Sequence, residues 1–236
     1  MTSSKMSGPE IRRGLVRWAV KTLIMNLLLV VGAFWAAGRL DWLWGWVMTA
    51  LLLGNLLLMA VWFIPTRPDL LVERSQAAED MADWDRYLVL PMAVLGPLLI
   101  AVVSGLDERY GWSTVPLPLS IVAVVLAQAG TGWAIWAMAA NRFFSGVVRI
   151  QSERGHAVQT GGPYGVMRHP GYAGAALYDL VMPLMLGSWW GLIPAVATVA
   201  VVVVRTMLED RKLQAELDGY TDYTARVRYR LLPGFW

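Results

Sequence analysis

Long uninterrupted apolar runs constrain this chain of 236 residues more than any other feature. The first covers about residues 15–37 and the second about residues 42–64. Each reaches the roughly 20 helical residues that cross a hydrocarbon core about 30 Å thick. The runs are continuous and do not alternate with polar residues, which argues against a membrane β-barrel. We therefore expect an all-α, polytopic membrane protein, because only helices and closed barrels satisfy their backbone hydrogen bonds in lipid.

Three more apolar stretches complete the expected fold, at about residues 87–104, 116–140 and 171–204. Glycine and proline residues between positions 183 and 194 divide the last stretch into a helical hairpin, whose two arms are barely long enough to span. The sequence thus predicts about six transmembrane helices. The first is expected to be an uncleaved span, because its apolar part is longer than the roughly 7–15 residues of a signal peptide core.

The basic residues divide unevenly between the two sides of this expected fold. Of the 20 lysine and arginine residues, 18 lie around the start of the first span, in residues 65–86, in residues 141–170 or after position 204. Only Arg39 and Arg109 fall in the opposite loops. Because cytoplasmic loops carry the basic excess, we expect both termini and the 141–170 stretch on the cytoplasmic face. Residues 65–86 are interpreted as a solvated linker, with a lid or a docking segment as the alternative.

Composition excludes several kinds of site. The chain has no cysteine, so a disulfide framework, a thiol nucleophile and a cysteine-based metal site are impossible. Two histidines leave little for any other metal site, and we expect no metal. The sequence pI of about 9.3 would suit a nucleic-acid partner, but the placement of the basic residues assigns them to membrane topology instead. The 13 tryptophans fit interfacial belts better than stacking on bases, so no nucleic acid is expected.

A polar, turn-rich stretch, residues 158–174, stands between the apolar runs and is the best candidate for chemistry. Gly161 and Gly162, followed by a proline, predict a tight turn, because glycine accepts positive φ and proline fixes φ. Such a turn either joins two helices or lets a ligand approach the backbone closely. Arg168 and His169 come next, and each suits an interfacial anchor as well as a binding site.

Acidic residues beside or inside the spans are the other candidates, because lipid penalises them unless they are paired or functional. Glu209 lies four residues after Arg205, on the same face of a helix, and Asp210 follows it. A surface ion pair and a functional site are both open for these residues. Asp179 lies inside the fifth span, where it serves either a structural polar contact or a function.

Together these residues resemble the isoprenylcysteine carboxyl methyltransferases and the related phospholipid N-methyltransferases. The matching pattern is His156-x-Val158-x-Thr160-x-Gly162-x-Tyr164-x-x-x-Arg168-His169-Pro170-x-Tyr172-x-Gly174, then Glu209-Asp210, Tyr220-x-x-Tyr223, Val227 with Arg230, and Leu231-Leu232-Pro233. It covers roughly residues 141–236, which we expect to form the methyltransferase region. Residues 1–140 carry no part of the pattern and are expected to form a four-span scaffold.

The resemblance implies S-adenosyl-L-methionine as the methyl donor, held by the loop, the end of the following helix and the tail. The cofactor-binding residues that it implies, with Arg168 added as a partner for the donor's carboxylate, are Arg149, His156, Ala157, Val158, Gln159, Tyr164, Arg168, His169, Pro170, Gly171, Tyr172 and Glu209. Arg149 stands where some relatives have a glutamine, and Asp210 where the family has a second glutamate. Arg205 stands where the family directs an arginine toward the substrate, and with Glu209 it is the expected catalytic pair.

The residue types suit this chemistry. Glu209 can pair with positive charge or accept hydrogen bonds from ribose hydroxyls, and the rings of Tyr164 and Tyr172 can approach a sulfonium. A carboxylate acceptor needs no general base, whereas an amine acceptor does, with Glu209, Asp210 or His169 as candidates. The expected partners are the lipid bilayer and a lipophilic or prenylated acceptor that enters sideways from it.

Three other readings remain open at this point. A phospholipid or amine N-methyltransferase fits the same pattern. Membrane sterol reductases that use NADPH resemble the chain in R-H-P-x-Y and in the acidic residues, but they are generally longer. A non-enzymatic scaffold or a transporter is the third reading, although a transporter would show interrupted helices in two related halves. Here the glycine and proline interruptions lie only in the C-terminal half.

Overall fold

The structure is a computed structural model that describes residues 7–75 and 80–236, all of them in helices, turns and irregular segments without strands. The α-helices are α1 (Gly8–Ala37), α2 (Leu43–Thr66), α3 (Pro68–Ser75), α4 (Asp85–Leu90), α5 (Gly96–Tyr110), α6 (Leu117–Ala140), α7 (Pro170–Met185), α8 (Leu192–Glu216) and α9 (Tyr220–Arg226). A π-helical turn, Pro91–Leu95, joins α4 to α5, and two 3₁₀ turns, Ser152–Arg154 and Gly162–Gly165, lie in the loop after α6.

Five helical segments are long and apolar enough to cross a membrane. They are α1, α2, the continuous segment Asp85–Tyr110, α6 and α8. The all-helical, multi-pass membrane fold is therefore confirmed, with five of the about six expected spans meeting this criterion among the described residues. The remaining helix, α7, has only 16 residues, because Pro170 begins it and the turn after Met185 ends it. It still packs within the bundle as the first arm of the expected hairpin.

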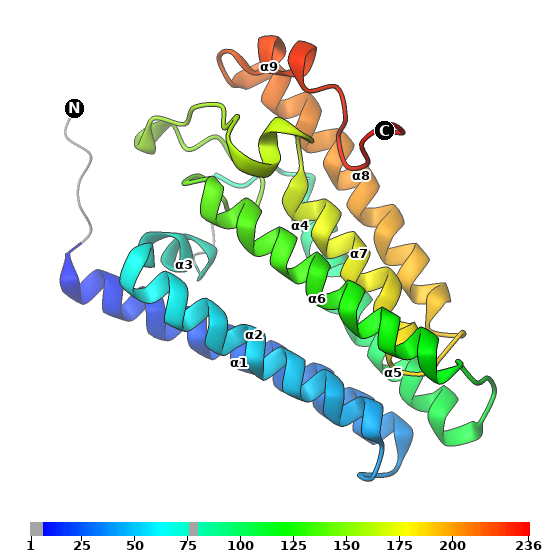
Figure 1. The fold of residues 1–236 in the computed structure, drawn as a ribbon. Helices are drawn as coiled ribbons and strands as arrows, with labels where there is room; N and C mark the ends of the chain where they lie inside the picture. The colour runs from blue at the N-terminus through cyan, green and yellow to red at the C-terminus, as the bar shows by residue number, and fades with distance from the viewer. Residues whose placement is uncertain (1–6, 76–79) are drawn as a thin grey trace.

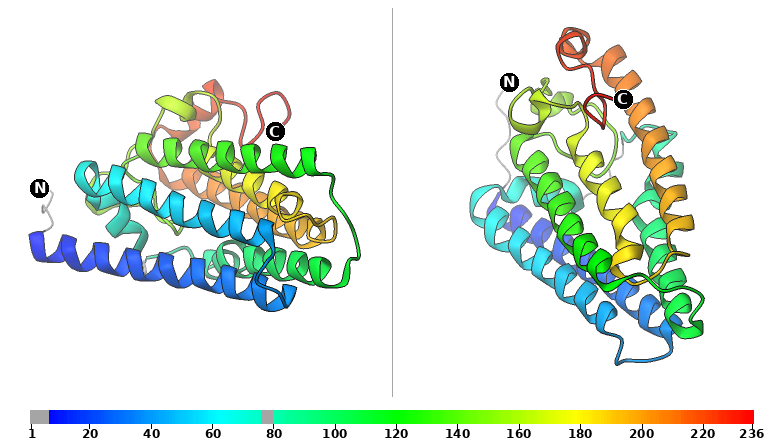
Figure 2. Two further views of the ribbon diagram at one scale, coloured as in Figure 1. Left: turned by 60° about the horizontal axis from the view of Figure 1, so that its bottom comes forward. Right: turned by 45° about the vertical axis from the view of Figure 1, so that its right-hand side comes forward.

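The long helices form one bundle with two unlike ends (Figure 1). Helix α1 lies beside α2, and α6 lies beside α7, which in turn lies beside α8; the turned views agree (Figure 2). Short turns after α1, α5 and α7 close one end. The start of α1, α3, the loop after α6, and α9 gather at the other end, so the segments rich in chemistry-bearing residues share one side.

Backbone contact between α6 and α7 fixes the position of the second half. A Cβ atom added to Gly174 would lie 2.4 Å from the carbonyl oxygen of Gly130, and one added to Gly130 would lie 2.7 Å from the carbonyl oxygen of Gly174. Small residues at such crossings let membrane helices approach closely. Helix α7 therefore holds Pro170, Gly171 and Tyr172 in a fixed place against α6.

Helix α3 differs from the solvated linker that the sequence suggested. Leu70 and Leu71 are buried in one cluster with Trp18 of α1 and Phe63 of α2, and Val72 is buried against Gly14 of α1. Lys21 of α1 donates to the backbone carbonyl of Ser75, the last residue of α3. The sequence did not reveal this short apolar face, because polar residues of α3 flank it. The interpretation of residues 68–75 as a solvated linker is therefore wrong. Residues 76–79 of the same stretch lie outside the described residues.

Candidate active site

The loop between α6 and α7 is held by hydrogen bonds to its own polar side chains. Asn141, where α6 ends, accepts a bond from the backbone N–H of Phe143 (2.9 Å) and donates to the hydroxyl of Tyr164 (3.3 Å). Gln151 is buried and donates to the carbonyl of Phe143 (2.7 Å). Gly162 has φ of +59°, which suits glycine, and begins the second 3₁₀ turn. The loop therefore has a defined path without forming regular structure.

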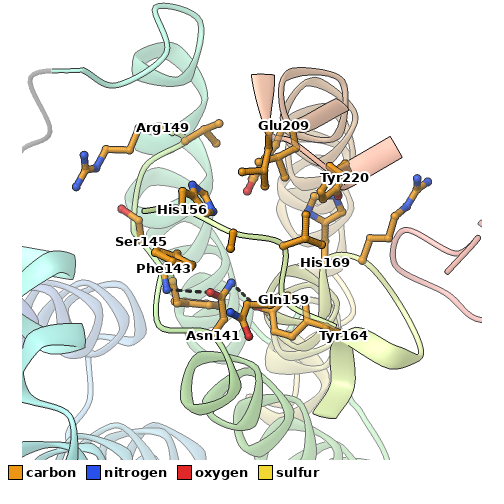
Figure 3. Close-up of a pocket in the computed structure, with 18 of the residues that line it drawn as sticks. Asn141, Phe143, Ser145, Arg149, His156, Gln159, Tyr164, His169, Glu209 and Tyr220 are labelled. Atoms are coloured by element: carbon orange, nitrogen blue, oxygen red, sulfur yellow. Dashed lines mark hydrogen bonds between the residues drawn. The ribbon is translucent and has the colours of Figure 1, made fainter. Parts of the chain in front are cut away.

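A cavity is enclosed by this loop, α7, the C-terminal part of α8, and α9 (Figure 3). Its lining includes eleven of the expected site residues, which are Arg149, His156, Ala157, Val158, Gln159, Tyr164, Arg168, His169, Gly171, Tyr172 and Glu209. The other lining residues are Asn141, Phe143, Phe144, Ser145, Val147, Val148, Leu213, Leu217, Tyr220 and Tyr223. Two expected residues, Pro170 and Arg205, do not line the cavity. Segments separated by up to 82 positions thus meet in one concave site.

Glu209 supplies the acidic wall of the cavity. The hydroxyl of Tyr172 donates to its carboxylate, and no ion pair joins Glu209 to a cation among the described residues. Aromatic rings from the loop, α7 and α9 form much of the remaining lining. An unneutralised carboxylate beside aromatic faces favours a cationic ligand, because both attract positive charge.

His156 is held as a neutral ring at the loop side of the cavity. Its Nδ1 accepts a bond from the backbone N–H of Gln151 (3.2 Å), and its ring packs at 4.5 Å from that of Phe143. Burial, followed by the nearby guanidinium of Arg149, lowers the pKa of His156 from 6.5 to about 4. The imidazole is therefore uncharged at neutral pH, with Nε2 carrying the proton.

Asp210 has a different place from Glu209, although the two are adjacent in sequence. It is fully buried and does not line the cavity. Its two oxygens accept bonds from Arg230 Nε (2.9 Å), the Tyr220 hydroxyl (3.0 Å) and Gln214 Nε2 (3.0 Å). His169 Nε2 lies 3.3 Å from it and Arg168 Nε lies 3.4 Å from it. Asp210 therefore joins α8 to the loop and to the C-terminal tail.

The C-terminal tail is docked by backbone bonds as well. Arg168 N–H donates to the carbonyl of Tyr229 (2.9 Å), and His169 N–H donates to that of Arg230 (3.0 Å). The buried Tyr223 of α9 donates its hydroxyl to the carbonyl of Tyr164 (2.7 Å). Burial raises the pKa of Tyr223, so its hydroxyl keeps the proton that this bond requires. The tail therefore forms one wall of the cavity and fixes the loop opposite it.

Arg205 is buried beside the cavity and is already engaged. Its Nε and NH2 donate to the two oxygens of Asp85 in α4 (2.6 and 2.9 Å), and NH2 also donates to the carbonyl of Gly146 (3.0 Å). Its guanidinium lies 5.2 Å from the centre of the Tyr172 ring. Asp85 also accepts a bond from the backbone N–H of Val148 (2.7 Å). Helix α4, outside the region that carried the sequence pattern, thus supports the cavity wall.

Arg149 lies at the rim, with its guanidinium directed away from the cavity (Figure 3). It pairs with Glu73 of α3 (3.0 Å), Asp80 (3.0 Å) and Glu153 (2.9 Å). Partial burial opposes the charged form, but the hydrogen bond and ion pair with Glu73, helped by the other two carboxylates, raise the pKa of Arg149. The guanidinium of Arg149 thus links the loop to α3, and only the aliphatic part of the side chain lies near the cavity.

Several residues at the site were not singled out from the sequence. Asp85 was read as one charge in a polar linker, and its partner lies 120 positions away. Phe143 and Phe144 carry no motif, although their aromatic pair directly after a span was a usable signal. Tyr220 was noted only as part of the tail pattern. Among the described residues, no three His, Asp or Glu side chains gather as ligands for a metal ion.

Comparison with known proteins bears on this region. Residues 117–217 match the family model described as phospholipid methyltransferase. The match begins with α6, includes the loop and α7, and ends one residue after α8, so it contains most of the cavity but neither α4 nor α9. No curated protein matches the chain. The resemblance inferred from the sequence is confirmed over these residues.

Proposed function

We propose that this chain, which resembles the phospholipid methyltransferases over residues 117–217, is a membrane methyltransferase that takes its methyl group from S-adenosyl-L-methionine. We further propose that the group goes to the carboxylate of a prenylcysteine or of a similar isoprenoid or lipid-like acceptor. The observation that carries the proposal is the cavity in which loop, α7, α8 and tail residues meet around Glu209. The competing reading as an NADPH-dependent reductase finds no support in the family match.

The donor set of the cavity suits S-adenosylmethionine. Glu209 offers a carboxylate to positive charge or to ribose hydroxyls, and Tyr164, Tyr172 and Tyr220 offer ring faces to adenine or to the sulfonium. Arg168 lines the cavity, and its guanidinium, whose Nε lies 3.4 Å from Asp210, is the proposed partner for the ligand's carboxylate. We propose that these residues, with the segment His156–Gln159 and with His169, Pro170 and Gly171, hold the cofactor.

When bound, the cofactor supplies an electrophilic methyl group, which bonds to an acceptor oxygen while the carbon–sulfur bond breaks and its electron pair stays on sulfur. The protein's part is alignment and exclusion of water, and correct placement alone can lower the barrier by several kcal/mol. Tyr172 fixes Glu209, and the Asp85–Arg205 pair fixes the ring of Tyr172 from the other side. A carboxylate acceptor releases no proton, so no base is required.

The match to phospholipid methyltransferases favours a second acceptor, a phospholipid amine. An amine must lose a proton as its nitrogen lone pair takes the methyl group, so that a base is required. Glu209 is the candidate for this role because it lines the cavity. Asp210 does not line it and has its oxygens occupied by five partners, and we therefore assign Asp210 to holding the tail.

We propose that this chemistry takes place on the cytoplasmic side of the membrane. The loop and α9 share one end of the bundle, and the basic residues concentrate at that end. Cytoplasmic loops carry the basic excess, which supports a cytoplasmic active site.

The test is cofactor binding followed by an acceptor screen. Purified protein in detergent should bind labelled S-adenosylmethionine, and Glu209→Gln should weaken this binding about tenfold or more, because a charge-assisted contact is lost. Glu216→Gln is the control, since Glu216 is exposed and Lys212 is its one ion-pair partner among the described residues. Methyl transfer to prenylcysteines, to phosphatidylethanolamine and to fatty acids then identifies the acceptor. Binding of NADPH without binding of S-adenosylmethionine would refute the proposal.

A further inference from the structure

Most guanidinium groups around the cavity are already neutralised. Arg205 pairs with Asp85, Arg168 lies against Asp210, and Arg149 has three carboxylates around it. Arg205 and Asp85 expose 2% and 0% of their side chains, so an incoming anion would have to displace a buried partner to reach Arg205. Such displacement is costly, because it leaves a charge buried without its pair. The expected substrate arginine is therefore poorly placed to bind an anionic acceptor.

Two arginines next to the cavity have no ion pair with any described carboxylate. The guanidinium of Arg74, in α3, lies 5.5 Å from the centre of the Phe144 ring. The guanidinium of Arg142 lies 4.5 Å from the centre of the Phe143 ring. Both phenylalanines line the cavity, and both arginines are exposed. Neither cation is therefore neutralised by a carboxylate in the described part of the chain.

Phe143 and Phe144 have different surroundings, so Arg142 and Arg74 differ in the part of the cavity that they lie beside. Phe143 packs against His156 in the polar loop, and Arg142 donates there to the carbonyl of Gly155. Phe144 packs instead against the apolar cluster that α1, α2, α3 and α6 form. Its ring also lies against Gly171, because a Cβ atom added there would be 2.8 Å from it. Arg74 thus stands where the cavity meets the membrane helices.

We propose that Arg74 binds the anionic group, a carboxylate or a phosphate, of the lipophilic molecule that enters the cavity from the membrane. The proposal rests on the proposed function in treating that molecule as the methyl acceptor. The apolar lining residues Phe144, Val147 and Val148 suit the hydrocarbon part, while Glu209, which also lines the cavity, suits a cationic donor. With Arg74 beside the apolar residues and Glu209 in the cavity, the anionic acceptor and the cationic donor would be bound at different places. Recognition of the acceptor would thereby lie in α3, outside the region that matches the family model.

The test measures binding of simple amphiphiles with twelve-carbon chains to detergent-purified protein, so that it does not depend on knowing the natural acceptor. The probes are dodecanoate, dodecyl phosphate and the uncharged dodecanol. The wild-type protein should bind at least one anionic probe about tenfold more tightly than the alcohol, and Arg74→Gln should abolish that preference. Arg74→Lys should restore part of it, since the charge returns without the forked geometry. The stronger of the two anionic probes indicates whether a carboxylate or a phosphate is recognised.

Arg142→Gln is the matched control, because it removes an equally unpaired guanidinium from an aromatic lining residue on the loop side. It should leave the preference for anionic probes unchanged. No anionic preference in the wild-type protein, or a preference that survives Arg74→Gln, would overturn the assignment. Loss of the preference in Arg205→Gln alone would move the role to Arg205. Binding of S-adenosylmethionine, measured on the same samples, reports on the proposed function separately, because Arg74 does not line the cofactor cavity.

Discussion

At the scale of single residues, the buried pair of Asp85 and Arg205 is the most consequential contact of the site. It joins α4 to α8 and also receives the loop through the backbone of Val148 and Gly146. Removing one partner of a buried pair leaves the other charged without compensation, which typically costs about 3–5 kcal/mol. Both side chains are almost completely buried, so solvent cannot replace the lost contact.

Asp85→Ala should therefore lower the free energy of unfolding by about 3–5 kcal/mol and weaken cofactor binding, since Tyr172 loses its fixed neighbour. Arg205→Met should have a cost of similar size. The double variant should be much less destabilised than the sum of the two, because neither charge is left alone. Denaturant unfolding in detergent checks this double-mutant cycle. Additive costs would show that the two residues do not act as a pair.

His156 makes stability depend on pH in a predictable direction. Its pKa is about 4 in the folded protein and 6.5 in its ordinary state, so the unfolded chain takes up the proton first as pH falls. Stability should therefore decrease as pH falls from about 6.5 toward 4, and it should be fully present above that window. Thermal unfolding of wild type and His156→Gln at several pH values isolates this residue, because the carboxylates titrate equally in both proteins. An unchanged pH slope in the variant would contradict the assignment.

The sequence predicted the site residues better than their partners. Tyr164, His169 and Glu209 were found because their spacing follows a known pattern, and the structure places them around one cavity. The engagement of Arg205 by Asp85 could not be predicted, because the two lie 120 positions apart and a charged run before a span looks like a linker. Roles toward the cofactor remain predictions for all of these residues.

At the scale of elements, the contact between α6 and α7 determines where the cavity can form. Hydropathy predicted both helices, but it could not predict that Gly174 and Gly130 bring the two backbones into contact. Hydropathy also overestimated α7, since the apolar run continues through the turn at Gly187. The short apolar face of α3 was missed for the opposite reason, because charged neighbours lower its average hydropathy.

Gly174→Ala should separate α6 and α7, because its Cβ atom would lie 2.4 Å from a backbone oxygen that cannot move aside easily. We expect a loss of stability of about 1–3 kcal/mol, the usual cost of overpacking. Gly132→Ala is the control within α6, since nothing lies within 4 Å of the added atom. It should be neutral or stabilising by about 0.5–1 kcal/mol, because alanine favours helix. Thermal unfolding in detergent compares the two, and equal melting temperatures would contradict the close-packing argument.

At the scale of the whole molecule, the two ends of the bundle differ in composition. One end carries the loop, α3 and α9 with their arginines, and the other carries short turns. The count of basic residues alone predicted this asymmetry, because the orientation of a membrane protein follows the distribution of lysine and arginine between its loops. Which helices share contacts could not be read from that count.

The absence of cysteine from the sequence allows a direct test of the topology. Thr221→Cys, in α9, should react with a membrane-impermeant thiol reagent only from the cytoplasmic side. Leu40→Cys, in the exposed turn after α1, should react only from the opposite side. Labelling of intact cells and of inverted vesicles makes the comparison. The same sidedness for both positions would rule out the arrangement of five spans with α7 as a further crossing arm.

The shortness of α7 affects how far a lipophilic acceptor would have to move from the membrane to reach the cavity. Sixteen residues rise about 24 Å, which is less than the thickness of a typical hydrocarbon layer. The neighbouring α6 has 24 residues and reaches further at the end where Pro170 begins α7. We therefore expect Gly171 and Tyr172 to lie at the depth of the acyl chains. We expect a lipid dissolved in that leaflet to present its head group for reaction without leaving the bilayer.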